Sequence, residues 1–244
     1  MDVLYGRNSV GEALRAGRKI HRVLIADGAH GLEALVADAR NRSILFEIHD
    51  RRELDRRAGD HHQGVIAEAE PFAYAHPEDL LASAEQRAEP PLLLALDSLQ
   101  DPQNFGTLLR TAQAVGTHGV LIPEHRAVGV TPAVSNASAG AVEHLRVARV
   151  TNLARALGQL KSSGVWVHGL AVDAQADYWD VDLSGPLALV VGSEGSGLGR
   201  LVREACDVLV RIPMAETAIQ SLNASVAGSL VLYEAFRQRR RSTK

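Results

Sequence analysis

The chain of 244 residues contains one cysteine, Cys206, which has no second cysteine with which to form an internal disulfide. No apolar stretch approaches the roughly 20 residues that a helix needs to cross a bilayer. The stretch nearest the C-terminus is interrupted by Glu234. The first 15 residues carry charges at Asp2, Arg7 and Glu12 and lack the continuous apolar core of a signal peptide. We therefore expect a cytoplasmic protein without membrane contact.

An excess of positive charge is also missing. A formal net charge of -3 argues against a generally basic nucleic-acid-binding protein, so any such binding must depend on local patches. Three basic clusters are candidates: Arg15, Arg18, Lys19 and Arg22; Arg51, Arg52, Arg56 and Arg57; and Arg237, Arg239, Arg240, Arg241 and Lys244. For each cluster the simpler interpretation is a solvated helix face.

Short apolar runs alternate with amphipathic segments up to residue 70 and predict a small α/β unit. Asn8 or Ser9 is expected to cap a first helix that runs through Ala16. Further helices are expected at 31–40 and 51–57, and strands at 23–25, 44–48 and 64–67. A proline-, alanine- and glutamate-rich composition then indicates a linker with one short helix. We place a first domain at 1–72, the linker at 73–90 and a second domain at 91–244.

The second domain contains nearly continuous apolar runs, as expected of strands that are buried on both faces. The predicted strands are 92–96, 119–122, 145–150, 165–172, 187–191 and 208–212, and the predicted helices are 104–115, 151–163 and 198–206. This pattern predicts a mostly parallel sheet covered by helices. Ligands of such sheets bind beyond the carboxyl ends of the strands.

The first loop at a predicted carboxyl end covers residues 101–110. Pro102 fixes a turn, Asn104 is placed to cap a helix, and Gly106 allows the backbone to approach closely. Arg110 follows Asn104 by slightly under two helical turns, so we expect both to face the same crevice. An N-cap with an ordinary surface arginine is the simpler alternative.

Two more loops have the same anatomy of strand, loop and helix. Residues 192–199 form a glycine-rich turn that could cradle a phosphate or accept a nucleoside. No Lys-Ser or Lys-Thr pair follows as in a P-loop, and the dinucleotide-binding context is absent. A purely structural role for this turn is the alternative interpretation. The third loop leaves a strand at Ile212 and Pro213 and enters an apolar helix at Ser221.

Together, these three loops resemble the motifs of the SpoU-type (TrmH) family in the SPOUT class of RNA ribose 2'-O-methyltransferases. The matching segments are Asp101-Pro102-Gln103-Asn104-Phe105-Gly106 with Arg110, residues 191–197, and Ile212-Pro213-Met214 with residues 221–227. Two N-terminal segments, residues 6–10 and 62–65, are similar to the ribosomal-protein-like RNA-binding domain of one subgroup. That subgroup methylates guanosine in 23S ribosomal RNA.

The resemblance implies an α/β catalytic domain closed by a deep trefoil knot, S-adenosylmethionine as cofactor, and an obligate homodimer that completes each site. The residues implied for cofactor binding are Gly192, Ile212, Met214 and Leu222. The implied catalytic and positioning residues are Asn104, Arg110, Glu194, Ser221 and Asn223. Arg110 is expected to bind the adjacent RNA phosphate and to stabilise the developing alkoxide, because its guanidinium is normally always protonated.

The sequence departs from the family at one place. Six residues, Ala215 to Gln220, separate Met214 from Ser221, where the family has five, and they include Glu216 and no glycine. We expect this loop to bulge on the adenosine side.

No metal site is predicted, because the ten histidines are scattered and the neighbours His61 and His62 do not share a face. Transfer RNA is the alternative substrate, although the separate N-terminal domain favours ribosomal RNA. A non-catalytic, ribosome-associated RNA-binding factor is a second alternative. A nucleotide-dependent oxidoreductase that uses the Gly192 loop is a third.

Overall fold

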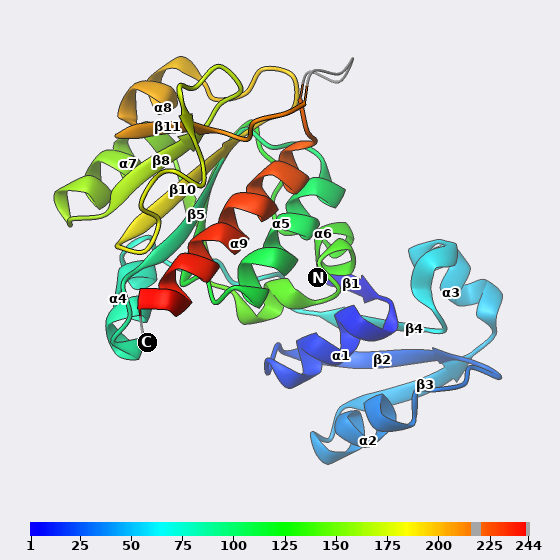
Figure 1. The fold of residues 1–244 in the computed structure, drawn as a ribbon. Coiled ribbons are helices and arrows are strands. Elements are labelled where there is room, and N and C mark those ends of the chain that lie inside the picture. Colours follow the sequence, from blue (N-terminus) through cyan, green and yellow to red (C-terminus); the bar gives the residue numbers. More distant parts are fainter. Residues whose placement is uncertain (216–220, 243–244) are drawn as a thin grey trace. The chain divides into compact units, whose positions relative to one another are not determined.

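The structure is a computed structural model that describes residues 1–215 and 221–242 (Figure 1). The chain forms two compact units. Unit 1 contains Met1–Ala73 and Val130–His144, and unit 2 contains Tyr74–Gly129 and the chain from Leu145 onward. Segment 130–144 lies inside the region that the sequence pattern assigns to the second domain, but its contacts group it with unit 1.

Unit 1 has a four-stranded sheet in the order β1-β4-β2-β3, formed by β1 (Asp2–Tyr5), β4 (Val65–Ala69), β2 (Ile20–Ala26) and β3 (Leu45–His49). β4 is antiparallel to β1 and β2, whereas β3 is parallel to β2. The carboxyl ends of β1, β2 and β3 therefore lie at one edge. β1 was not anticipated from the sequence pattern.

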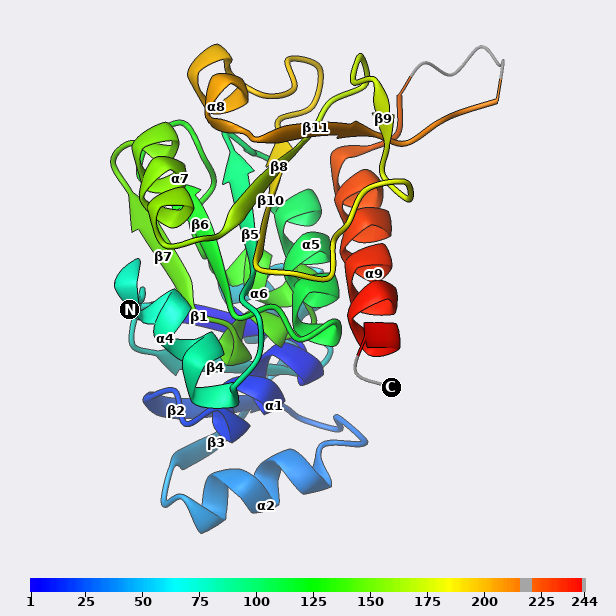
Figure 2. The same ribbon diagram turned by 60° about the vertical axis from the view of Figure 1, so that its left-hand side comes forward.

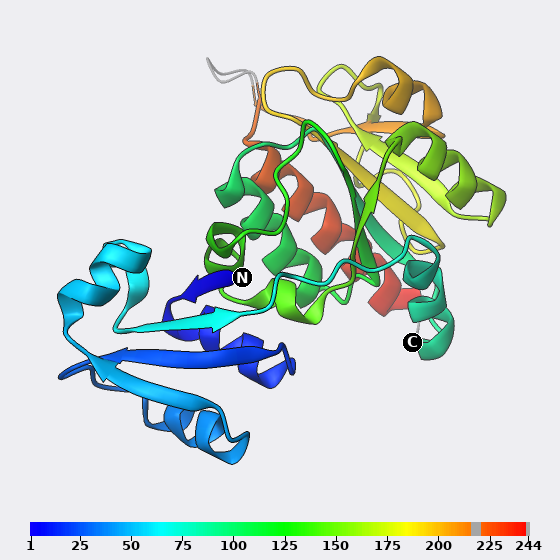
Figure 3. The same ribbon diagram turned by 180° about the vertical axis from the view of Figure 1, so that it is seen from behind.

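Alternate residues of β2 enter two separate cores, as the strand period of two requires. Val23 and Ile25 pack with residues of α1 (Arg7–Arg15) and α2 (Glu33–Asn41). Leu24 packs instead with Leu54 of α3 (Arg51–Ala58). Figure 3 views this sheet from the side opposite to α1 and α2.

Three short helical elements complete unit 1: η1 (Asp60–His62), α6 (Pro132–Ala137) and η2 (Ala141–His144). The predicted cap of α1 is wrong. Gly6 is the N-cap residue, with a φ of 87° and no side-chain hydrogen bond, and Asn8 and Ser9 lie inside the helix. A positive φ is a conformation that glycine adopts without strain, so the backbone rather than a side chain sets this helix start.

Unit 2 contains a seven-stranded sheet in the order β7-β6-β5-β10-β8-β11-β9. Its strands are β5 (Leu92–Asp97), β6 (Gly119–Pro123), β7 (Val147–Val150), β8 (Trp166–Leu170), β9 (Ala176–Asp177), β10 (Leu187–Gly192) and β11 (Val208–Arg211). All neighbouring strands are parallel, which confirms the predicted α/β class. The loops that follow β5, β10 and β11 therefore meet at one edge.

Helices cover both faces of this sheet (Figure 2). On one face, α4 (Glu78–Arg87), α7 (Leu153–Ser162) and α8 (Arg200–Ala205) contribute Leu80, Leu157 and Val202 to a common core. α4 falls within the segment predicted as a linker, and its Leu80 is fully buried. On the other face, α5 (Pro102–Ala114) packs against α9 (Ala224–Ser242).

The C-terminal end of α9 is fastened to the rest of unit 2 by Arg239. Its guanidinium donates to the carbonyl oxygens of Pro90 at 2.6 Å and Pro91 at 2.9 Å, and also to that of Gly185. Burial lowers the pKa of Arg239 to about 10. Within the described chain, no helix is both long and apolar enough to span a membrane.

Candidate active site

α5 begins with an aspartate cap rather than the predicted asparagine cap. A carboxylate oxygen of Asp101 accepts a hydrogen bond from the backbone amide of Asn104 at 2.9 Å, and Pro102 occupies the first helical turn. Asp101 satisfies one of the free amides at the helix start, and proline at this position leaves no amide to satisfy. The carboxamide of Asn104 is therefore released from capping and points to another loop.

Glu194 joins the three predicted loops. The Nδ2 groups of Asn104 and Asn223 both donate to Glu194 Oε1, the second at 2.7 Å. Asn104 follows β5, Glu194 follows β10, and Asn223 precedes α9. The structure thus brings together three of the five predicted polar residues, at the edge where parallel-strand topology places ligand sites.

The other end of the Asn223 side chain caps α9. Its Oδ1 accepts hydrogen bonds from the backbone amides of Ser225 at 2.9 Å and Val226 at 3.3 Å, and from Ser225 Oγ at 2.6 Å. This pattern is that of an asparagine N-cap. These bonds suit a residue that positions a loop.

The glycine-rich loop after β10 is a tight hairpin. The backbone groups of Ser193 and Gly197 bond each other in both directions, at 3.2 and 3.0 Å. A side chain on Gly192 would place its Cβ 2.3 Å from the carbonyl carbon of Gly197, so glycine alone fits there. Gly195 and Gly197 have φ angles of 80° and 64°, which side chains rarely tolerate.

Asp97, at the carboxyl end of β5, belongs to this site although the sequence motifs did not include it. One oxygen of its buried carboxylate accepts the backbone amide of Gly199 at 2.7 Å, and the other accepts Ser98 Oγ at 3.1 Å. The carboxylate thereby fastens the glycine-rich loop to β5. A carboxylate at the end of a fully apolar strand was the available signal in the sequence.

Apolar side chains lie beside these polar groups. Met214, which follows β11, and Leu222, which precedes α9, are 36% and 37% exposed. Gly192 is buried, and Ile212 is half-buried directly after β11. Exposed apolar side chains next to a glycine-rich backbone provide both stacking surface and hydrogen-bonding groups, so these residues fit an adenosine-containing cofactor.

The loop that carries the extra residue is described only at its start. Ala215 is exposed, but residues 216–220, including Glu216, lie outside the described residues. Ser221 is exposed and makes no hydrogen bond with any residue in the described ranges. The predicted bulge on the adenosine side stays a prediction.

Arg110 does not join the cluster, contrary to the expectation that it shares a crevice with Asn104. Six residues at 100° each turn the helix by about 600°, which separates the two side chains by roughly 120° around the axis. Asn104 is accordingly buried, whereas Arg110 is exposed on α5. Its guanidinium forms neither a hydrogen bond nor an ion pair with any described residue, so its charge is available to a ligand or partner.

Among the described residues, no three His, Cys, Asp or Glu side chains group closely enough to hold a metal ion. His62 is buried in unit 1 and bonds Asp55 at 2.8 Å, while His61 is exposed. Burial raises the pKa of the Cys206 thiol to about 11, so this cysteine stays protonated at neutral pH.

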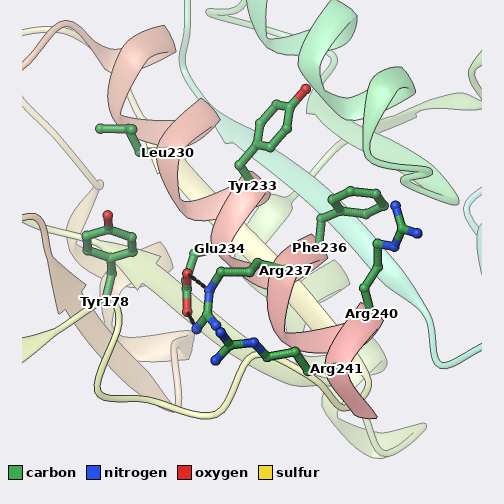
Figure 4. A pocket seen from close by; sticks show the side chains of 8 residues that line it. All are labelled: Tyr178, Leu230, Tyr233, Glu234, Phe236, Arg237, Arg240 and Arg241. Carbon is green, nitrogen blue, oxygen red and sulfur yellow. Dashed lines mark hydrogen bonds and ion pairs between the residues drawn. The ribbon is translucent and has the colours of Figure 1, made fainter. Parts of the chain in front are cut away.

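A cavity of about 640 Å³ lies along the outer side of α9 (Figure 4). It is lined by Tyr178, Leu230, Tyr233, Glu234, Phe236, Arg237, Arg240 and Arg241. Leu230 and Tyr233 are 41% and 53% exposed, and Val226 one turn earlier is 47% exposed. α9 therefore presents an uncovered apolar stripe on unit 2.

Comparisons with known proteins match both units. The model of the SpoU rRNA Methylase family matches residues 91–233, and the model for RNA 2'-O ribose methyltransferase substrate binding matches residues 3–75. A relative from Bacillus subtilis, named YacO and described as a TrmH family tRNA/rRNA methyltransferase, is 45% identical over 240 residues. That match covers 98% of this chain and 96% of the relative.

Two solved structures share the whole fold. The SpoU methyltransferase AviRb from Streptomyces viridochromogenes, in complex with the cofactor AdoMet, superposes with a TM-score of 0.82 at 25% identity. The match covers 98% of this chain and 90% of AviRb. An AdoMet-bound rRNA methyltransferase from Sinorhizobium meliloti gives a TM-score of 0.76 at 26% identity, covering 97% of this chain and 87% of the other.

Proposed function

Because the chain belongs to the SpoU rRNA methylase family, we propose that it methylates the ribose 2'-hydroxyl of a guanosine in 23S ribosomal RNA. The protein is an S-adenosylmethionine-dependent RNA methyltransferase. The choice of ribosomal RNA and of guanosine is the proposal. The observation that carries the site assignment is Glu194, which joins Asn104 and Asn223 beside the glycine-rich loop.

Ribosomal RNA is favoured over transfer RNA by two observations. A substrate-binding domain model of RNA 2'-O ribose methyltransferases matches residues 3–75, so the N-terminal unit adds substrate surface to the catalytic domain. The Sinorhizobium meliloti structure that matches 97% of the chain is named an rRNA methyltransferase. The YacO relative is named for both RNA classes, which keeps transfer RNA as the alternative. An RNA substrate also supports a cytoplasmic location.

Cofactor binding is assigned to the strand ends of unit 2. Gly192 and the backbone that follows it would hold the polar part of S-adenosylmethionine, with Ile212, Met214 and Leu222 against the adenosine. When bound, the cofactor supplies an electrophilic methyl group on its sulfonium sulfur. The protein's contribution is to hold the ribose oxygen in line with that methyl group.

In the transfer, the ribose 2'-oxygen forms a bond to the methyl carbon as the carbon–sulfur bond breaks, and the hydroxyl proton leaves to solvent. A ribose hydroxyl is a weak nucleophile at neutral pH, so the developing negative charge on its oxygen needs stabilisation. Arg110 supplies the positive charge that stabilises this oxygen and also binds the adjacent phosphate. Its guanidinium can do so because it has no protein partner among the described residues. Asn104, Glu194, Ser221 and Asn223 position the loops around the ribose.

The position of Arg110 supports a homodimer in which this residue serves the partner's site. Arg110 lies on the exposed face of α5, away from Asn104 and Glu194 of its own chain. The stripe of Val226, Leu230 and Tyr233 recurs at i, i+4 and i+7 along the neighbouring α9, as expected of a helix face that a second chain covers. A second copy docked there would bring each Arg110 toward the partner's strand ends.

The trefoil knot is part of the same proposal. β11 is inserted between β8 and β9, and α9 then returns across the sheet to contact β10 and α5. This return of the final helix agrees with a C-terminal segment that is threaded through the domain. Such threading is rare among folds, which makes family membership the main argument for it.

Mapping of 2'-O-methylation in cells with and without the protein tests the function. Loss of methylation at one guanosine of 23S ribosomal RNA, restored by the wild-type gene, is the expected result. Loss at a transfer RNA position would overturn the substrate assignment. A purified protein that binds RNA but not S-adenosylmethionine would instead identify a non-catalytic RNA-binding factor.

A variant separates the role of Arg110 from cofactor binding. Arg110→Ala should abolish methyl transfer and leave the Kd for S-adenosylmethionine near the wild-type value, because the residue lies outside the cofactor cluster. The two quantities are measured by transfer of a labelled methyl group and by calorimetry. Substantial residual transfer would remove Arg110 from the mechanism.

A further inference from the structure

The three basic clusters of the sequence differ in whether acidic groups of the protein neutralise them. All four members of the first cluster form ion pairs within unit 1: Arg15 with Glu12, Arg18 with Asp2 and Glu143, Lys19 with Glu70, and Arg22 with Glu68. In the third cluster, Arg237 pairs with Glu234 and Arg240 lies over the ring of Phe236. The cluster on α3 combines members that pair with acidic groups and members that form no ion pair with any described residue.

The paired part of α3 belongs to a closed ring of six charged side chains on unit 1. Its members are Arg22, Glu68, Arg57, Glu53, His49 and Glu47, in that order around the ring. Arg57 bonds Glu68 at 3.1 Å and Glu53 at 2.6 Å. Arg22 closes the ring through two bonds to Glu68, at 2.7 and 2.8 Å, and an ion pair with Glu47 at 3.7 Å. The ring fixes α3 onto β2, β3 and β4.

Neither Asp50 nor Asp55, the other acidic groups of α3 and its cap, forms an ion pair with an arginine of α3. Asp50 caps the helix by accepting the amide of Arg52 at 2.8 Å, and Asp55 bonds His62 at 2.8 Å. Arg51, Arg52 and Arg56 are exposed and form no ion pair with any residue that the structure describes. The one bond of the Arg56 guanidinium in that range goes to the backbone carbonyl of Arg52, at 3.4 Å.

Arg52 and Arg56 are neighbours on one face of α3, four residues apart. Two like charges at this spacing repel each other, and a phosphate bound between them would offset this repulsion by attracting both guanidinium groups. α3 begins at the carboxyl end of β3, at the edge where Arg7 follows β1. Arg7 is exposed there, and its side chain is held by a 3.2 Å bond to the carbonyl oxygen of Gln63.

We propose that Arg51, Arg52 and Arg56 of α3, together with Arg7, bind the phosphate backbone of the substrate RNA. This inference rests on the proposed function, because it names the surface through which unit 1 holds its RNA. Arg57 is excluded from the patch, since the charged ring already occupies its guanidinium. The N-terminal contribution to RNA affinity is therefore electrostatic and depends on salt.

The test compares two double variants with equal changes in charge. Arg52→Gln with Arg56→Gln removes two charges from the patch. Arg40→Gln with Arg42→Gln removes two exposed charges at the end of α2, which leads into the opposite end of β3. The probe is fluorescently labelled, deproteinised bacterial ribosomal RNA, and its affinity is followed by anisotropy across a salt series. The patch variant should reduce the slope of log K against log salt by about 1.5 and weaken binding roughly tenfold at moderate salt.

The control variant should keep the wild-type slope, and Arg52→Lys with Arg56→Lys should restore the slope because the charge returns. A patch variant that melts at the wild-type temperature and retains the wild-type slope would overturn the proposal and identify α3 as a solvated face. Calorimetric binding of S-adenosylmethionine is measured on the same samples. A wild-type protein that binds the cofactor but shows no affinity for any RNA would contradict the proposed function itself.

Discussion

At the scale of single residues, Glu194 is the shared acceptor on which the geometry of the site depends. Charge-assisted hydrogen bonds are roughly twice as strong as neutral ones, so one carboxylate oxygen can hold two amides. The sequence placed Asn104, Glu194 and Asn223 at one edge, because parallel strands end together. It could not show that both amides bond the same oxygen. Glu194 lies 90 positions from Asn104 and 29 positions from Asn223, so these contacts depend on the tertiary fold.

Asn104→Asp tests this arrangement through its charge. The variant places a second carboxylate against Glu194, which should cost about 1–3 kcal/mol of unfolding free energy at neutral pH and exceed the cost of Asn104→Ala. Repulsion between the two carboxylates raises a carboxyl pKa in the folded state. The loss of unfolding free energy therefore develops as pH rises above the unfolded pKa, and acidification relieves it. Denaturant unfolding at pH 5 and pH 8 measures it. A difference in unfolding free energy between Asn104→Asp and Asn104→Ala that does not change with pH would contradict the contact with Glu194.

We expect His49 to make the stability of unit 1 depend on pH. Here the cause is attraction between unlike charges, not repulsion between like charges. Hydrogen bonds to Glu47 and Glu53 raise the pKa of His49 above its ordinary value. A raised histidine pKa means that the stabilisation is complete below the unfolded pKa, near 6.5, and disappears as pH rises through the folded value. Thermal unfolding of the wild type and His49→Gln should therefore differ at pH 6 and converge above pH 8. A difference that persists unchanged at pH 9 would exclude the protonated imidazole as its source.

At the scale of elements, the sequence predicted the buried strands at the centre of the unit 2 sheet and missed β9 and α6. β9 has two residues and α6 has six, lengths at which neither a period of two nor one of 3.6 can be recognised. α4 was expected only as a short helix within a linker, because its short sequence offers few apolar residues besides Leu80 and Leu81, which pack in the core. The side of α5 on which Arg110 lies could have been predicted from the helical period.

The glycine-rich hairpin gives a prediction at this scale. Gly192→Ala should abolish cofactor binding and lower the melting temperature, because its Cβ would lie 2.3 Å from the backbone of Gly197 and the hairpin would have to open. Gly158→Ala is the matched control. Its Cβ meets no atom within 4 Å on the exposed side of α7, so it should stabilise the protein by about 0.5–1 kcal/mol. Calorimetry with S-adenosylmethionine and thermal melting of both variants measure these effects, and cofactor affinity that survives in Gly192→Ala would contradict the assignment of the loop.

At the scale of the whole molecule, the sequence motifs alone could not show that the polar residues divide into two groups. Asn104, Glu194 and Asn223 form one connected cluster, and Arg110 stands apart from it on the exposed side of α5. If one site needs both groups, a second chain can supply Arg110, as we propose. In the proposed homodimer, the apolar stripe on α9 and the cavity beside it would provide the surface for that association.

Subunit mixing decides whether Arg110 acts in its own chain or in the partner. Arg110→Ala and Glu194→Ala should each be inactive as homodimers, since each lacks one group in both sites. After unfolding and refolding together, half of the dimers are mixed, and one of the two sites in each carries both groups. Activity should therefore return to roughly a quarter of the wild-type value, as random pairing in a two-fold dimer requires.

The mixing experiment includes its own control for association. Differently tagged chains report by co-purification that mixed dimers have formed. Leu230→Glu, which places a charge in the apolar stripe of α9, should yield monomers by light scattering and prevent any recovery. If mixed dimers form and no activity returns, Arg110 must act within its own chain. The separation of Arg110 from Glu194 would then have to close by movement of α5 when RNA binds.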